Sequence, residues 1–175
     1  RDASGNVTVL GVGGKRVGSV CLLHYENEGG FTVLPASAEQ IVGSVVLIPA
    51  NTLKPGDTFR FVLNSEDAGA ADAQDRALRL RIHTSESVMS GVTLTMASVS
   101  SAGNYKFTVD KAISIVSNTV ARSSFGATGV ISTASHSVAA IDCTVDQYIG
   151  LTIRNANTLV NHLIYFVKLT LEAAQ

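Results

Sequence analysis

Polar and apolar residues alternate along several short stretches of the chain, as in β-strands with one buried face. The stretch TFRFVLN (58–64) places its two phenylalanines and Leu63 on one face. ALRLRIH (77–83) separates its leucines and isoleucine from its arginines and histidine in the same way. In three further runs, the alternation assigns inward positions to Val92, Leu94 and Met96, to Tyr105, Phe107 and Val109, and to Leu163, Tyr165, Val167, Leu169 and Leu171.

Other runs are continuously apolar, namely GSVCLLHY (18–25), GSVVLIP (43–49), AISIVS (112–117) and QYIGLTI (147–153). Such runs are typical of strands covered on both faces or at a subunit contact. Together the runs predict an all-β fold, an antiparallel β-sandwich of eight to ten strands. One short helical turn at most is expected from each of 37–45, which has a weak capping pattern, and the stretch beginning at Ala70.

The stretch VLIPANTLKPGDTFRF (46–61) contains two prolines and a glycine. Pro55 cannot donate to a sheet ladder, so Lys54–Asp57 must form a turn or an edge. Pro49 confines the end of the preceding strand to an edge or exit position. We interpret the stretch as a hairpin that fixes strand register and carries no catalytic chemistry.

The composition indicates one globular domain that associates with copies of itself. The chain has 175 residues, 46% of them hydrophobic and 15% charged, with a net charge of -1. This length suits one domain, and the scattered Lys and Arg residues argue against a nucleic-acid surface. The apolar runs are too short to span a membrane. Near-zero charge on an apolar chain favours a homo-oligomer.

The stretches IPANTLKPGD (48–57), IDCTVDQYIGLTI (141–153) and NHLIYFVKLTLE (161–172) also carry a resemblance to a known family. In order and spacing, 45–172 resembles the β-sandwich domain of tailed-phage structural proteins, which occur as head decorations, head fibres and tail fibres. The resemblance implies a jelly-roll-like sandwich in a virion, a trimer, and contacts with other virion proteins. A receptor- or glycan-binding tip of a phage fibre is the alternative function.

The search for catalytic or cofactor chemistry is largely negative. GVGGKRVGS (11–19) has Arg16 where the third glycine of a dinucleotide fingerprint belongs, and it does not fit a P-loop. No GxSxG elbow is present, and the four histidines have no metal-binding spacing. We therefore expect no enzyme activity, no cofactor and no metal. His24 and His162 suggest a pH-sensitive subunit contact.

Two loops are the candidate recognition sites, because long loops on a rigid sandwich commonly carry variable function. The first is the charge-dense stretch 64–77, whose acidic spacing favours a solvated hairpin loop over a calcium site. The second is the small-residue stretch 121–137. Their candidate recognition residues are Glu66, Asp67, Asp72, Asp75, Arg122, Phe125 and His136.

Residues 1–16 are expected to be an N-terminal arm or connector, and 17–175 the sandwich domain. Within the arm, the candidate subunit-contact or anchoring residues are Val9, Leu10, Lys15 and Arg16. Both cysteines, Cys21 and Cys143, lie in apolar runs and are expected to be small buried hydrophobes. A disulfide between them would require neighbouring strands.

Overall fold

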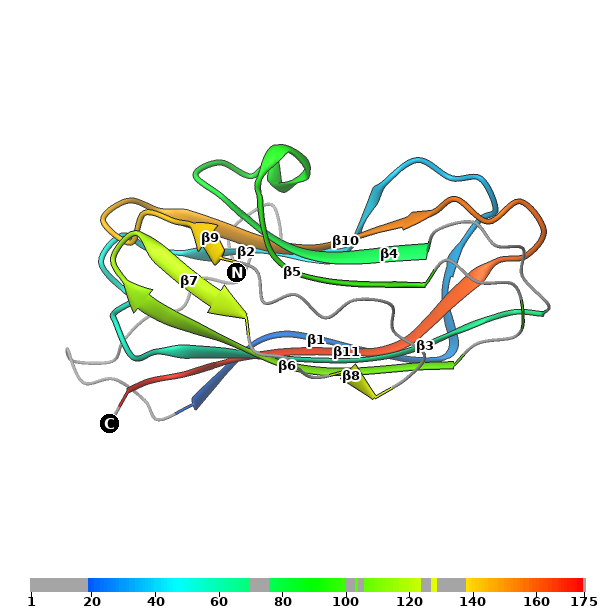
Figure 1. Ribbon diagram of the computed structural model, residues 1–175, viewed down its shortest axis with the longest axis horizontal. Helices are drawn as coiled ribbons and strands as arrows, with labels where there is room; N and C mark the ends of the chain where they lie inside the picture. The colour runs from blue at the N-terminus through cyan, green and yellow to red at the C-terminus, as the bar shows by residue number, and fades with distance from the viewer. Residues whose placement is uncertain are drawn as a thin grey trace.

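A computed structural model describes residues 19–69, 76–99, 103, 106–123, 127–128 and 138–174. These residues form two antiparallel sheets packed face to face, so the predicted all-β sandwich is confirmed (Figure 1). The larger sheet contains β1 (Ser19–Val33), β11 (His162–Glu172), β3 (Thr58–Asp67), β6 (Lys106–Ser117), β7 (Val120–Ser123) and β9 (Val138–Ala140) in this order, with β8 (Ala127–Thr128) beside β6. The smaller sheet contains β2 (Gln40–Ile48), β10 (Gln147–Asn155), β4 (Arg76–His83) and β5 (Val92–Val99). The described residues thus form eleven strands, where eight to ten were expected. Two of the eleven, β8 and β9, are very short.

The strand order is that of a jelly roll. Strands β1 to β4 alternate between the two sheets, β4 and β5 pair as neighbours, and β6, β10 and β11 return to complete the orders β1-β11-β3-β6 and β2-β10-β4-β5. Two interleaved four-stranded sets of this kind define the double-sheet jelly roll. Strands β7 to β9 are inserted between β6 and β10, and β7 and β9 rise from the larger sheet toward the smaller one at one end of the sandwich (Figure 1).

The alternation in β3 and β4 is confirmed and supplies the centre of the core. Phe59, Phe61 and Leu63 are at most 2% exposed, as are the leucines and isoleucine of β4. Burying each such side chain contributes about 1.5–3 kcal/mol. Arg79, Arg81 and His83 of β4 face outward, as predicted, and are only partly exposed.

The apolar run of β10 is covered on both faces within the same chain. Seven of its nine residues are buried. Its outer face is closed by the loop that contains the 3-10 turn η2 (Val88–Ser90), because a Cβ atom at Gly150 would lie only 3.0 Å from Val88. Figure 1 shows this loop lying over the smaller sheet. The run 112–117 in β6 instead alternates, with Val116 49% exposed.

The turn at Lys54–Asp57 is confirmed, but the hairpin prediction is wrong. The backbone N–H of Asp57 donates to the carbonyl of Lys54 at 3.0 Å, and the Asp57 carboxylate accepts from the Lys54 N–H at 2.9 Å. Gly56 adopts φ 94°, which this turn requires and which L side chains resist. The strands on either side, β2 and β3, belong to different sheets. The turn therefore carries the chain across the sandwich.

Two alternation predictions fail because β-bulges shift the phase. In β11 the register with β3 slips between Ile164 and Phe166, so Ile164 is buried while Leu163 and Tyr165 face outward. In the β4–β5 pair the register slips after Leu80, so Met96 lies opposite Arg79 on the outer face and is 47% exposed. Val92 pairs with buried Ile82 and is 42% exposed without a change of phase. One extra residue in a strand reverses the faces of all positions beyond it.

Two smaller predictions also need correction, and a third falls outside the described residues. Residues from Gln40 onward form β2 instead of a helical turn, and the helical turn found in the described residues is η2. Cys143 is buried as expected, but Cys21 is exposed, and both thiols are free. Residues 70–75, where the second helical turn was expected to begin, lie outside the described residues.

Candidate functional site

Only three of the predicted recognition residues, Glu66, Asp67 and Arg122, lie among the described residues. Glu66 and Asp67 belong to β3, so the loop that follows is shorter than predicted. Arg122 is exposed on β7. The remaining predicted site and arm residues lie outside the described residues: Asp72, Asp75, Phe125, His136, Val9, Leu10, Lys15 and Arg16.

Asp67 is unavailable to an external ligand because it lies in a buried charged cluster. One carboxylate oxygen accepts from Arg76 Nη2 at 3.0 Å, and the other lies 3.0 Å from His162 Nδ1. All three side chains are at most 1% exposed. Asp67 and His162 lie in the larger sheet and Arg76 in the smaller one, so the cluster joins the sheets. His162 thus lies in the interior, which contradicts its prediction as a subunit contact.

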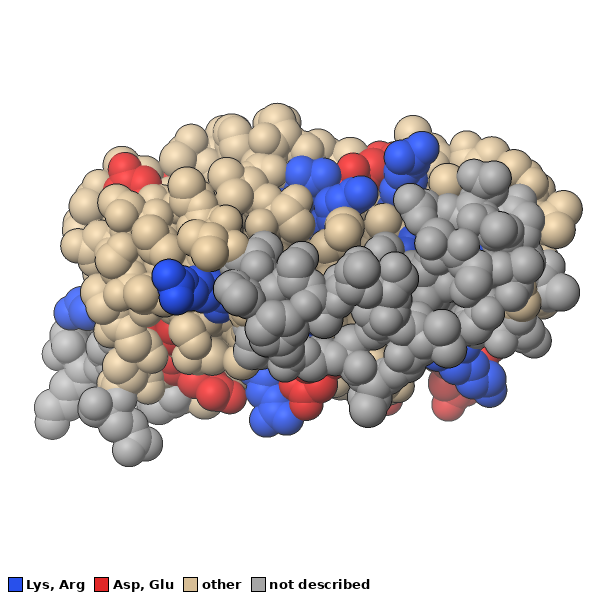
Figure 2. Space-filling model, viewed as in Figure 1, with Lys and Arg blue, Asp and Glu red and all other residues tan. Residues whose placement is uncertain are grey.

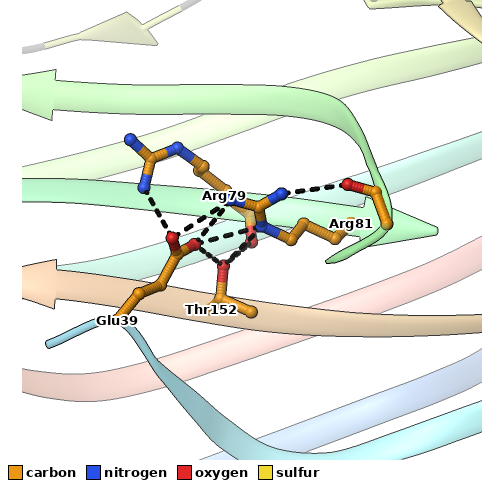
Figure 3. Close-up of polar contacts among 5 residues, drawn as sticks. Glu39, Arg79, Arg81 and Thr152 are labelled. Carbon is orange, nitrogen blue, oxygen red and sulfur yellow. Dashed lines mark hydrogen bonds and ion pairs between the residues drawn. The ribbon is translucent and has the colours of Figure 1, made fainter. Parts of the chain in front are cut away.

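A second cluster surrounds Glu39 on the outer face of the smaller sheet. The Glu39 carboxylate accepts three hydrogen bonds of 3.0–3.1 Å from Arg81 and one from the Thr152 hydroxyl, and it lies 3.3 Å from Arg79 Nη1 (Figure 3). Arg81 also donates to the carbonyl of Gly91 at 2.9 Å. Burial alone would raise the pKa of Glu39, but the hydrogen bonds from Thr152 and Arg81 and both positive charges outweigh it and lower the pKa.

The outer face of the larger sheet carries an open groove of about 270 Å³, lined by Glu26, Glu28, Asn64, Tyr165 and Phe166. Irregular strand pairing creates it. Between its pairings with Phe166 and Ile164, β1 runs from Glu26 to Phe31, so five steps on β1 face two on β11. The bulge in β11 then turns Tyr165 and Phe166 outward together, and both are partly buried.

The groove has a defined polar setting. The Tyr165 hydroxyl donates to Glu66 at 2.6 Å, which holds the pKa of Glu66 below its ordinary value and raises that of Tyr165. Lys106 lies 3.5 Å from the same carboxylate and lowers its pKa further. The ring of His24 meets Phe166 edge to face at 5.6 Å, and His24 Nε2 lies 3.7 Å from Glu26. The lining itself contains two carboxylates, an amide and two aromatic rings.

A second hollow, of about 280 Å³, lies near the Lys54–Asp57 turn and includes Cys143 and Thr144 in its lining. Burial raises the pKa of the Cys143 thiol, as do the negative charges of Asp142 and Asp57. A thiol with a raised pKa is a poor nucleophile at neutral pH.

A serine and a histidine do meet elsewhere in the described chain. Ser85 Oγ lies 2.8 Å from His83 Nδ1, and the same nitrogen is 3.0 Å from the Ser85 backbone nitrogen. The pair is exposed and does not line either of the two hollows.

The described part of the chain contains no group of three or more His, Cys, Asp or Glu side chains that could hold a metal ion. It also contains no helix with the length and apolar character needed to cross a membrane.

The comparisons with known proteins add no relative. No family model, curated protein or solved structure matches the chain.

Sequence reasoning missed the groove because it assumed regular alternation through β11. The adjacent aromatic residues Tyr165 and Phe166 could have revealed the bulge, since neighbouring strand positions ordinarily face opposite sides. The paired glycines Gly29 and Gly30 were a second signal, because Gly30 adopts φ 71° within the irregular part of β1.

Proposed function

We propose that the protein is a structural module of a bacteriophage particle, a capsid decoration or fibre module, that associates with copies of itself and attaches to other virion proteins. The jelly-roll topology supports this proposal because viral capsid domains commonly use it. The fold also serves other functions. The argument for a binding role therefore depends on the surface.

The observation that carries the proposal is an apolar flank where the two sheets meet. Strands β5 and β9 end their sheets, and neither pairs with a further strand among the described residues. They contact each other and expose Val92 and Met96 of β5 and Val138 of β9, the last 58% exposed. Figure 2 shows a mostly uncharged flank over β7 and β9, with a basic group at β7, whereas charges gather along the outer surfaces of the two sheets.

Buried Lys111 of β6 reaches the backbone of β5 at this flank. Its ammonium group donates to the Met96 carbonyl at 2.7 Å, and burial lowers its pKa. This backbone acceptor on β5 is therefore satisfied, while the Met96 side chain remains 47% exposed. Exposed aliphatic side chains on two edge strands favour contact with another protein surface.

A second copy of the chain is the partner proposed for the flank. The net charge of -1 provides little repulsion between copies. Cyclic symmetry, as in a trimer, would cover every flank without open-ended polymerisation.

Light scattering coupled to size exclusion tests the proposal on the complete chain at micromolar concentration. We expect a mass that is a multiple of 18.3 kDa. The double variant Met96→Lys/Val138→Lys should shift the protein toward the monomer. Leu159→Lys is the matched control, because Leu159 is also exposed (65%) but lies in the loop between β10 and β11. A monodisperse wild-type monomer would contradict the proposal.

A further inference from the structure

We propose that the groove formed by Glu26, Glu28, Asn64, Tyr165 and Phe166 binds the basic pair Lys15-Arg16 of a neighbouring copy. This inference rests on the proposed self-association and gives the N-terminal arm an acceptor site. It makes the arm a connector between subunits.

The chemistry of the groove favours a cationic occupant. Glu26 and Glu28 are exposed and give the lining two negative charges without a lysine or arginine among the lining residues. The nearby Glu66 is already engaged by Tyr165 and Lys106, so it adds no free carboxylate to the groove. An ammonium or guanidinium group could pair with Glu26 and Glu28 and contact the aromatic rings.

The groove also excludes some other ligands by charge. The two carboxylates would repel an acidic sugar or a phosphate. A neutral sugar would leave both carboxylates without a counter-charge, whereas a basic peptide neutralises them. A basic segment therefore complements the lining better than a glycan does.

The chain contains one segment with this property. Lys15-Arg16 is its only pair of adjacent basic residues, and glycines at 13, 14 and 18 surround it. Glycine neighbours allow the backbone to approach a surface closely. The apolar residues Val9 and Leu10 lie a few positions upstream.

The length of chain between Lys15 and Ser19 assigns this segment to a neighbouring copy. Glu26 lies seven residues beyond Ser19, about 23 Å along β1 at the usual strand rise. Lys15 lies four residues before Ser19, and four extended residues span at most about 14 Å. The segment would also use residues in reversing direction over β1. It therefore falls short of the groove of its own subunit, while a second copy has no such limit.

Charge reversal tests the inference on the complete chain. We expect Glu26→Lys/Glu28→Lys to weaken self-association by about tenfold or more, and Lys15→Glu/Arg16→Glu to do the same. Sedimentation equilibrium measures the association constants. Combining all four substitutions should restore association, because it exchanges the signs of both partners. Restoration also shows that the variants fold. Glu86→Lys, an exposed carboxylate on the loop over the other sheet, is the matched control and should leave association unchanged.

A labelled peptide with the sequence VLGVGGKRVG (9–18) provides a second readout. It should bind the wild-type chain and lose its affinity for Glu26→Lys/Glu28→Lys. An oligomer whose association none of the reversals changes would overturn this inference and leave the proposed function intact. A monomeric wild type would overturn both. A glycan-array signal abolished by Phe166→Ala would also overturn the inference and assign the groove to a saccharide.

Discussion

Carboxylates in two regions of the sandwich are used in opposite ways. Between the two sheets and on the outer face of the smaller sheet, Asp67 and Glu39 are surrounded by basic side chains and hydrogen-bond donors from the same chain. In the groove of the larger sheet, Glu26 and Glu28 are exposed. The first pair is committed to holding the fold together. The second is available to a partner, so the two regions should respond differently to the loss of a charge.

The largest effect is expected at the buried cluster. Asp67→Ala would leave Arg76 and His162 in the interior without the carboxylate that both contact. Removing one member of a buried ion pair costs about 3–5 kcal/mol. Urea unfolding followed by circular dichroism should show this loss of stability. A change below about 1 kcal/mol would mean that the cluster does not join the two sheets.

Glu39→Gln should have the next largest effect, a loss of about 1–3 kcal/mol, because Glu39 and both arginines remain partly exposed. The loss should depend on pH. The folded pKa of Glu39 lies below the ordinary value of 4.5, so its stabilisation is present above that value and disappears as pH falls through the folded pKa. Unfolding measured at neutral and acidic pH should therefore show the wild type and the variant converging in acid. A constant difference would contradict the ionic role.

Tyr165→Phe should lower the unfolding free energy only slightly, since it removes one hydrogen bond in a partly exposed setting. Its clearer consequence is electrostatic. Without the tyrosine hydroxyl, the pKa of Glu66 should rise toward its ordinary value. An NMR titration of the Glu66 carboxyl group measures this shift, and an unchanged pKa would mean that Lys106 alone sets it.

Glu28→Gln is the counterpart of Glu39→Gln and should have the smallest effect on the unfolding free energy, within about 0.5 kcal/mol. The same substitution should nevertheless weaken self-association. If Glu28→Gln lowered the unfolding free energy as much as Glu39→Gln does, the carboxylates of the two regions would not differ in their contribution to the fold. Thermal unfolding of dilute protein, where subunits are dissociated, is the appropriate measurement.

The parts of the fold that the sequence predicted are those where local pattern and burial agree. Alternation in β3 and β4 gave the correct faces because both strands lie within a sheet, where β3 pairs regularly with β6 around Phe61 and β4 pairs regularly with β10 around Leu80. In β5 and β11 a bulge leaves one residue without a partner on the adjacent strand, so the alternation changes phase there. Pairing with the adjacent strand determines where the bulge lies. The hairpin prediction failed for a similar reason, since the turn at Pro55 has the same local chemistry whether the chain returns to its own sheet or crosses to the other.

The groove could not be predicted in full because it combines β1, β3 and β11, which are distant in sequence. The arginine partners of Asp67 and Glu39 likewise come from the opposite sheet or from neighbouring strands. The exposed position of Cys21, beside a register shift in β1, shows the same dependence on long-range pairing.

Hydrogen–deuterium exchange at low and high protein concentration tests self-association through the flank most directly. Amides of β5 and β9 should become protected as the protein assembles, while those of β2, the opposite edge of the smaller sheet, should exchange at the same rate in both samples. Equal exchange of β5 and β9 at the two concentrations, or new protection confined to β2, would contradict the account.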